Sequence, residues 1–304
     1  MFFKKLYFKI FKSQTKYSNL KSSLLLSQKL ESFNKNYKGK IEEISNLLSK
    51  KKELSFLHSG HCGDLIYSLA VIQKISKTHK CNFYVGLNKK IYPKYQTHPS
   101  GEVFINEHMM KLILPLLKSQ KYLNIVKHHD HEKIDINLDL FRDLPVSLFF
   151  NSPRWYFHIT GEQVDLSEPY IHIDENLNLK DKILIHRTFR YRNKFISYDF
   201  LKNRDDIYFL GLKDEYEDLK KQIPRLKIYE TNNFLEMAQA IKSCKFFIGN
   251  LSVAYPIAEA LKTPRLLEAC PEFPVVQPVG GDGYDFYYQP HFEKWFNYLL
   301  NKYS

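Results

Sequence analysis

The spacing of hydrophobic positions changes near residue 53. Before it, apolar residues recur at helical intervals among many lysines, as in Ile41, Ile44 and Leu48. After it, short apolar runs such as ELSFLH and CNFYVGL alternate with longer segments of helical spacing, such as DLIYSLAVIQKI. Strands that alternate with helices are typical of a parallel, doubly wound sheet. We therefore expect an α/β fold behind a helical N-terminal appendage.

The second half of the chain alternates most regularly. Strands are predicted in KILIHRT, DIYFLGL, LKIYET, KFFIGN and PRLLEAC, with helices between them at 197–203, 213–222, 233–243 and 253–262. In the first half, IDINLDL at 134–140 alternates strictly and predicts an edge strand. A Ser/Asn-rich break is expected within the appendage, near residues 13–36.

These patterns divide the chain into three parts. We expect a basic helical appendage at 1–52, a Rossmann-like domain at 53–175, and a second Rossmann-like domain at 176–304. The polar stretch DENLNLKD is the predicted linker between the two domains. The last helix is a candidate to pack back on the first domain.

The formal net charge of +12 favours anionic partners such as nucleotides, phosphorylated lipids or an anionic membrane. Lysine occurs throughout the chain, which argues against a dedicated nucleic-acid surface. The N-terminus, MFFKKLYFKIFKSQ, lacks the apolar core of a signal peptide. Its lysines and its aromatic residues fall on different sides of a helix, which suits either an anionic membrane surface or docking on the protein itself.

A loop of small and polar residues, HSGHCGDLIYSL, joins the first predicted strand to its helix. Gly60 and Gly63 permit a tight turn and a close backbone approach. Free N–H groups at the start of a helix attract an anion. Asp64 suits a helix cap. In a loop that also holds His58 and His61, Asp64 equally suits the abstraction of a proton from a sugar hydroxyl.

A second cluster, HRTFRYRNK, follows the first strand of the second domain and holds four cations within eight residues. Its candidate ligand-binding residues are His186, Arg187, Thr188, Arg190, Arg192 and Lys194. Guanidinium groups match the oxygens of phosphate in a forked geometry, so this loop is predicted to bind a diphosphate. A basic loop without a ligand is the alternative.

Two further segments follow predicted strands. In FIGNLSVAYPIAEAL, Asn250 and Ser252 lead into a helix whose N-terminus suits a phosphate. In PVGGDGYDFYY, Gly281 and Asp282 belong either to a ligand-lining loop or to a surface turn. Adjacent histidines in KHHDHEK are typical of a solvated charged loop, and the four cysteines form no CxxC pair, so no metal site is expected.

Together these segments resemble the heptosyltransferase-like glycosyltransferases of family 9, which have the GT-B fold, over roughly residues 53–300. CGDLIYSLAVIQKI is similar to the family's Gly-Asp turn, whose Asp is implicated as the catalytic base, and the resemblance carries that role to Asp64. Thr188, Arg190 and Lys194 match the family's loop for the donor diphosphate.

Two other family motifs are matched in part. Gly211 and Glu215 stand where the family has a G-x-x-x-E motif that contacts the nucleoside. GNLSVAYP retains Asn250 and Ser252 of the family's last signature. Leu251, Val253 and Pro256 stand there in place of the family's Asp, Gly and His, which help to hold the donor.

The resemblance implies an inverting, metal-independent glycosyltransferase that needs no cofactor. Its two Rossmann-like domains, at 53–175 on the acceptor side and at 176–304 for binding the nucleotide sugar, would face a cleft. It would transfer a sugar from a nucleotide-diphosphate donor to a hydroxyl of a surface glycan or lipopolysaccharide-like acceptor, in the cytoplasm, with the basic N-terminus at the inner membrane face. Two alternatives stay open: a phage-type enzyme that glycosylates DNA bases, and a non-catalytic protein that binds a sugar nucleotide. A nicotinamide dehydrogenase is disfavoured because no G-x-G-x-x-G follows a predicted strand.

Overall fold

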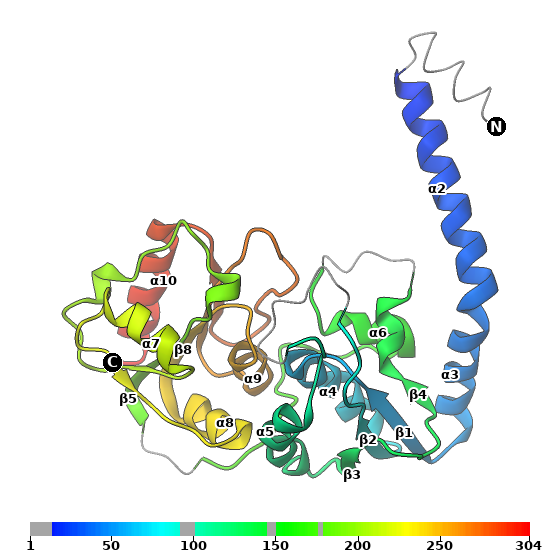
Figure 1. Cartoon of the computed structure of the whole chain (residues 1–304), viewed down its shortest axis with the longest axis horizontal. Helices are drawn as coiled ribbons and strands as arrows, with labels where there is room; N and C mark the ends of the chain where they lie inside the picture. The colour runs from blue at the N-terminus through cyan, green and yellow to red at the C-terminus, as the bar shows by residue number, and fades with distance from the viewer. Residues whose placement is uncertain (1–13, 92–100, 145–149, 176–178) are drawn as a thin grey trace.

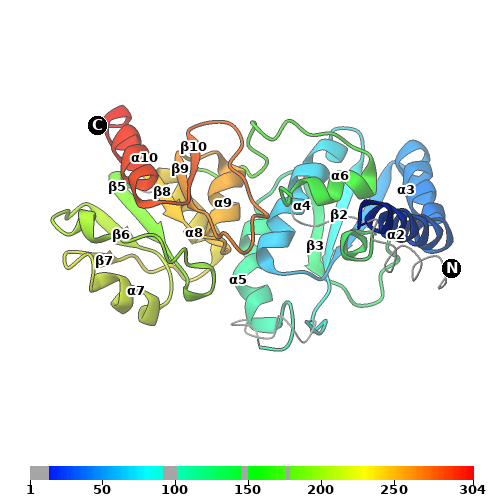
Figure 2. The ribbon, with the colours of Figure 1, turned by 90° about the horizontal axis from the view of Figure 1, so that it is seen from above.

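The computed structural model describes residues 14–91, 101–144, 150–175 and 179–304. These residues form two domains, each built on one parallel sheet, and the domains lie side by side (Figures 1 and 2). The first sheet has the order β3-β2-β1-β4, with strands Leu123–His128, Lys80–Val85, Glu53–His58 and Ile136–Asn137. The second has the order β10-β9-β8-β5-β6-β7, with strands Gly283–Phe286, Arg265–Glu268, Cys244–Gly249, Leu179–His186, Ile207–Phe209 and Lys227–Ile228. The prediction of two α/β domains with parallel sheets is confirmed.

Helices connect the strands and cover the sheets. In the first domain they are α4 (Cys62–Ser76), α5 (Glu107–Lys118) and α6 (Arg154–Thr160). In the second they are α7 (Lys213–Lys220), α8 (Phe234–Ser243), α9 (Ala254–Leu261) and α10 (Gln289–Lys302). The last helix, α10, packs on β9 and β10 of its own sheet.

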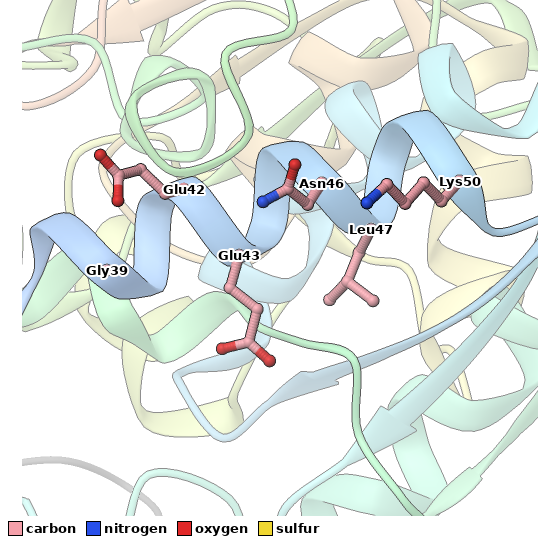
Figure 3. A pocket seen from close by; sticks show the side chains of 6 residues that line it. All are labelled: Gly39, Glu42, Glu43, Asn46, Leu47 and Lys50. Carbon is pink, nitrogen blue, oxygen red and sulfur yellow. The ribbon is translucent and has the colours of Figure 1, made fainter.

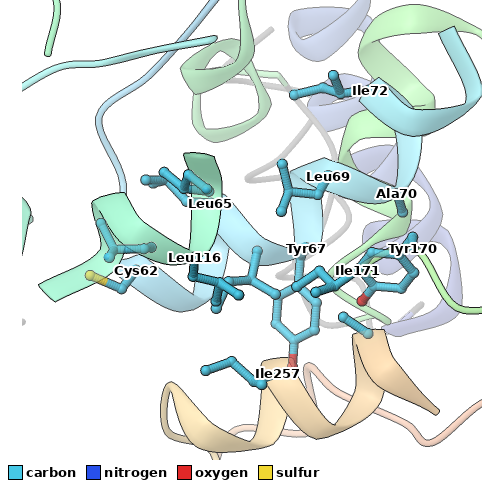
Figure 4. Packing of buried hydrophobic residues seen from close by; sticks show 14 of the residues in the cluster. Cys62, Leu65, Tyr67, Leu69, Ala70, Ile72, Leu116, Tyr170, Ile171 and Ile257 are labelled. Atoms are coloured by element: carbon cyan, nitrogen blue, oxygen red, sulfur yellow. The ribbon is translucent and has the colours of Figure 1, made fainter. Parts of the chain in front are cut away.

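The two domains meet through α4 and α5 on one side and α9 and α8 on the other. Helix α4 buries ten of its fifteen residues and α9 all eight, because each lies between its own sheet and the neighbouring domain. This double burial explains why both segments are apolar around most of their circumference. Figure 4 shows Tyr67 of α4 and Ile257 of α9 within this shared core.

The N-terminal appendage consists of α2 (Gln14–Asn36) and α3 (Lys38–Lys50). Helix α3 buries Ile44 and contacts α6, whereas α2 buries none of its residues and extends away from both domains (Figure 1). The break expected near 13–36 is wrong, since α2 is continuous from residue 14. Its serines are accommodated because their hydroxyls bond back to carbonyls in the preceding turn, as Ser23 does to Leu20 at 2.9 Å. The helix predicted for residues 1–12 lies outside the described residues.

Three other predicted elements differ from the structure. The edge strand expected at 134–140 is reduced to β4, because the Asn137 side chain accepts the Asp139 N–H and turns the chain into a 3-10 turn, Leu138–Arg142. The helix expected at 197–203 is only the short turn Asp199–Leu201. The glycine-rich segment at 278–288, read as a loop, contains strand β10, which pairs with β9 in parallel.

One open hollow of about 350 Å³ lies along α3 (Figure 3). It is lined by Gly39, Glu42, Glu43, Asn46, Leu47 and Lys50. Since it lies on the appendage, it is separate from the carboxyl edges of both sheets, where ligands bind in folds of this kind. Among the described helices, none combines the length and the apolar composition that a membrane span requires.

Candidate functional site

The carboxyl end of β1 leads into a turn whose polar groups are almost all engaged. Buried His58 accepts the Gly60 N–H at Nδ1 over 2.9 Å, so its Nε2 carries the proton and donates to the Tyr156 hydroxyl at 2.7 Å. That hydroxyl donates to the Asp64 carbonyl at 2.9 Å. Burial lowers the pKa of His58, which agrees with a neutral ring. His58 therefore fixes the turn rather than facing a ligand.

Asp64 holds two roles at once. Its Oδ2 accepts the His61 N–H at 3.3 Å, which caps α4, and it accepts Nη2 of Arg142 at 2.7 Å. The other Arg142 nitrogen, Nη1, donates to Asp139 at 3.0 Å. The Asp64 side chain keeps 18% of its surface exposed, and within the described residues its Oδ1 receives no hydrogen bond. A fixed carboxylate with one open oxygen suits a group that takes a proton from a bound hydroxyl.

Arg142 is held from several directions. Its guanidinium lies over the rings of Phe104 and Phe141, at 4.7 and 4.2 Å from their centroids. Asp139, which it also contacts, is buried and accepts the Lys89 ammonium at 2.8 Å. The arginine that orients Asp64 is thus rigid before any ligand arrives.

Gly60 lies against this ion pair. A Cβ at this position would lie 2.6 Å from Cε1 of His58 and 2.8 Å from Oδ2 of Asp64, and closer still to Arg142. Glycine is needed here because the backbone approaches the charged groups too closely for any side chain.

The cations after β5 separate into two groups. Arg187 is 4% exposed and donates from Nε and Nη2 to Glu268, at 2.6 and 3.1 Å. Arg192 pairs with Asp218 and lies over Phe189, 4.4 Å from the ring centroid. Within the described residues these two guanidinium groups are therefore already neutralised.

Arg190 and Lys194 form the second group. Both side chains are exposed, and neither forms an ion pair within the part of the chain that the structure describes. Arg190 lies over the Tyr191 ring at 4.4 Å. Of the four cations singled out in the sequence, these two form no ion pair among the described residues, and Arg192 keeps buried Nε and Nη2 groups without a partner there beside its ion pair with Asp218.

Asn250 binds the same loop rather than solvent. Its Oδ1 accepts the Thr188 N–H at 3.1 Å and the Thr188 hydroxyl at 3.3 Å, and its Nδ2 donates to the Thr188 carbonyl at 2.8 Å. Fully buried, it clamps the end of β8 to the loop after β5. Ser252 follows in the turn that leads to α9, with its N–H on the Asn250 carbonyl.

Buried polar atoms without partners gather at the ends of β5 and β6. His186 donates from Nδ1 to the Leu210 carbonyl at 2.5 Å, but its Nε2 has no partner among the described residues. Glu215 accepts the Phe189 N–H at 3.2 Å on Oε1, and its buried Oε2 likewise has none. Burial lowers the pKa of His186 to about 4 and raises that of Glu215. Gly211 adopts φ 157°, and a Cβ there would lie 2.9 Å from Phe209.

The two carboxyl edges are brought together at the domain junction. A Cβ on Gly63 would lie 3.2 Å from Cγ of Pro256, so the start of α4 touches the start of α9. Burial lowers the pKa of His61 to about 4, and the positive charge of Arg190 from the other domain acts in the same direction. Asn250, which precedes α9, also binds Thr188 in the loop after β5, so contacts through α9 connect that loop to the start of the Asp64 helix.

Gly281 and Asp282 lie elsewhere. Asp282 accepts the Lys302 ammonium at 2.8 Å and the Tyr303 hydroxyl, both at the end of α10. Gly281 has φ 57° and lies near the buried side chain of Arg265. Asp282 joins the last helix to the sheet, and we leave both residues out of the site proposed below, together with Arg187 and His58.

Sequence reasoning did not identify Arg142, Asp139 or Tyr156. Arg142 and Asp139 lie three residues apart, a spacing that puts an Asp and an Arg on one side of a helical turn. That signal was hidden because the segment was read as an alternating strand.

The sequence matches no protein-family model and no curated protein. Among solved structures, the chain is similar to the Escherichia coli heptosyltransferase WaaC with ADP, with a TM-score of 0.53 and 9% identity over 83% of this chain and 100% of that one. It also matches a glycosyl transferase of family 9 from Veillonella parvula DSM 2008, with a TM-score of 0.47 and 15% identity over 77% and 86%. A third match is the E. coli ADP-heptose lipopolysaccharide heptosyltransferase II, with a TM-score of 0.47 and 12% identity over 82% and 99%.

The similarity to WaaC confirms the GT-B arrangement of two Rossmann-like domains that the sequence predicted. At this identity the likeness concerns the fold, and function has to be argued from the side chains.

Proposed function

We propose that this chain is a glycosyltransferase that moves a sugar from a nucleotide-diphosphate donor to a hydroxyl of a surface glycan or lipopolysaccharide-like acceptor. One observation carries the proposal. The carboxylate of Asp64 is held by Arg142 at 2.7 Å at the start of α4, which meets Pro256 of α9, and Asn250 before α9 holds the loop that carries the exposed Arg190. Transfer of a sugar requires a proton acceptor for the acceptor hydroxyl and a cation for the donor diphosphate, and here the two groups come from different domains.

In the proposed reaction, the acceptor hydroxyl donates its hydrogen bond to Asp64 and attacks the anomeric carbon. The bond from that carbon to the phosphate oxygen breaks as the new glycosidic bond forms, and Asp64 takes the proton. A single displacement of this kind inverts the anomeric configuration. Negative charge grows on the departing diphosphate, and Arg190 and Lys194 would offset it in place of a divalent metal.

The nucleoside would bind beside α7. Glu215 has an unpartnered buried oxygen there, and its other oxygen holds the Phe189 N–H of the phosphate-binding loop. A ribose hydroxyl that donates to the free oxygen would satisfy it. Gly211 leaves room for the Phe209 ring and His186 next to this site, Thr188 and Asn250 hold the loop in shape, and Ser252 would meet the diphosphate from the start of α9.

A thermal-shift screen with ADP-, GDP-, UDP- and dTDP-sugars tests the donor. A ligand present at ~100 times its dissociation constant adds about 2.7 kcal/mol to the free energy of unfolding. The double variant combines Arg190→Gln with Lys194→Gln. Its control is Lys202→Gln, since Lys202 is exposed and precedes β6 at the opposite edge of the sheet. We expect one nucleotide class to stabilise the protein, and only the double variant to lose that effect. No stabilisation by any of the four, or equal loss in the control, would refute the donor assignment.

The acceptor side points to a membrane surface. Residues 1–52 hold thirteen lysines and three glutamates, so they carry +10 of the net charge of +12, and residues 53–304 carry only +2. Helix α2 exposes Leu25, Leu26 and Leu30 as it extends from the domains (Figure 1). Lysines beside exposed apolar groups favour anionic lipid, at about 1 kcal/mol per lysine near the surface. We therefore propose peripheral attachment through the appendage.

Vesicle sedimentation tests this attachment. Binding is expected to vesicles with ~30% phosphatidylglycerol and not to pure phosphatidylcholine, and to fall sharply in 0.5 M salt (an ionic strength of about this size screens exposed charges). Replacing the α2 lysines Lys16, Lys21, Lys29 and Lys35 with Gln should weaken it. Equal binding to both vesicle types would contradict the proposal. The same charge distribution disfavours the DNA-modifying alternative, because the catalytic domains themselves are nearly neutral.

A further inference from the structure

Exposed apolar side chains concentrate at the carboxyl edge of the second sheet. Five of the ten large apolar side chains that are exposed in the described part of the chain lie there: Phe189, Phe195, Leu212, Phe273 and Tyr288, with 39–64% of their surface exposed. Leaving aromatic side chains in water forgoes a burial worth about 25 cal/mol per Å². A group of them beside a charged site marks a surface that a ligand covers.

Three of these residues belong to two aromatic pairs, whose fourth member, Tyr191, is half-buried. Tyr191 and Phe273 lie 5.8 Å apart with their rings at 77°, and Phe195 and Tyr288 lie 5.9 Å apart at 43°. The second pair borders the start of α10, since Tyr288 is the residue before that helix. The first pair lies nearer the domain junction, and we call Tyr191 and Phe273 the aromatic wall.

Contacts on both sides place the wall at the junction. The loop of Phe273 crosses to the first domain, where the Val275 carbonyl accepts the N–H and the hydroxyl of Ser152 at 2.8 and 2.7 Å. On the other side, Tyr191 lies beneath the guanidinium of Arg190, in the loop that Asn250 connects to α9, and Pro256 of α9 meets Gly63 of the Asp64 turn. The wall therefore stands beside both the proposed base and the proposed phosphate-binding cation.

The chemistry of the wall differs from that of its charged neighbours. A phosphate would be held by cations alone and gains nothing from a phenyl ring. A sugar ring has a face of C–H groups with slight positive charge, which the negative face of an aromatic ring attracts. Its hydroxyls remain free at the rim for polar groups such as Arg190. An apolar surface with a polar rim, next to a site for transfer, fits a sugar ring better than a nucleobase, whose proposed place is beside Glu215.

We propose that the aromatic wall holds a sugar ring by stacking during transfer, an inference that rests on the glycosyltransferase function proposed above. The ring belongs either to the donor, beyond its diphosphate, or to the acceptor. Both are sugars, and the measurement separates them.

The test uses the full chain with Tyr191→Ala and Phe273→Ala, Tyr191→Phe as the conservative variant, and Phe195→Ala as the matched control from the other aromatic pair. Calorimetry measures the dissociation constants of the nucleotide sugar found in the screen above and of its bare nucleoside diphosphate. Transfer kinetics with a deacylated lipopolysaccharide core oligosaccharide give the KM of the acceptor.

We expect each alanine variant to weaken sugar binding about tenfold, with Tyr191→Phe and Phe195→Ala unchanged. If the affinity for the nucleotide sugar falls and the affinity for the bare nucleoside diphosphate does not change, the ring belongs to the donor. If the acceptor KM rises and the affinity for the nucleotide sugar does not change, the ring belongs to the acceptor. If neither the KM nor this affinity changes, or if the affinity for the bare nucleoside diphosphate falls equally, the wall does not bind a sugar. If the wild-type chain neither binds a nucleotide sugar nor transfers one, the proposed function itself fails.

Discussion

Replacing Arg187 with Met should destabilise the second domain specifically. Glu268 is fully buried and accepts four hydrogen bonds: two from Arg187, one from the Asn193 N–H at 2.7 Å and one from the Tyr198 hydroxyl at 2.9 Å. The substitution removes the cation and two of these donors. A buried charge left without its partner costs about 3–5 kcal/mol. We expect the lower end, about 3 kcal/mol, because two donors remain.

Tryptophan fluorescence makes this measurable in one domain. The chain has two tryptophans, Trp155 in the first domain and Trp295 in α10, where it stacks on Tyr284 at 4.0 Å. In a Trp155→Phe background, urea unfolding followed at Trp295 reports the second domain. With a urea dependence of about 2–3 kcal/mol per M, a loss of 3 kcal/mol lowers the midpoint by roughly 1–1.5 M.

The double variant, Arg187→Met with Glu268→Gln, is the control. It leaves no unpaired charge, so it should recover a substantial part of the lost stability. A single-variant loss below about 1 kcal/mol, or a double variant as unstable as the sum of both single changes, would refute the view that Arg187 serves Glu268 rather than a ligand.

Two other outcomes follow from the same structure. Because burial lowers the pKa of His186 to about 4 in the folded state from about 6.5 unfolded, the unfolded chain takes the proton first on acidification. The free energy of unfolding of the second domain should therefore fall by up to about 3 kcal/mol between pH 6.5 and 4. The fall should be less steep in His186→Asn. Urea titrations that give the same dependence on pH for the variant and the wild type would contradict this. Gly60→Ala should lower sugar transfer at least about 100-fold by displacing Arg142 from Asp64, with donor affinity kept. Gly39→Ala, with open space around it in α3, is the control and should change stability by less than about 1 kcal/mol and leave transfer intact.

The sequence predicted the fold well where the signal is local. The buried strands and the helices between them were found from spacing, and so was the cap of α8, where Asn233 accepts two backbone N–H groups. Strand β10 was missed because its four residues begin at a glycine and lie in a segment rich in turn residues. Helix α2 was predicted to break because serine and asparagine are weak helix formers, but the leucines and lysines between them are good helix formers and sustain the helix.

The site was less predictable because its partners are distant in the chain. Arg187 and Arg190 look alike in the sequence, and only Glu268, 81 residues away, makes the first a core residue. Arg142 lies 78 residues from Asp64, so no local pattern joins them. Residue type and strand position could indicate an anion-binding edge, but which cations remain available depends on tertiary ion pairs.

The most direct test of the account is the rate of sugar transfer by Asp64→Asn, measured together with its affinity for the donor. Asparagine keeps the size of the side chain and its cap of α4 but cannot take a proton. We predict a fall in kcat of about 10²–10⁴ with an unchanged donor dissociation constant. Turnover close to that of the wild-type chain would contradict the claim that Asp64 is the base.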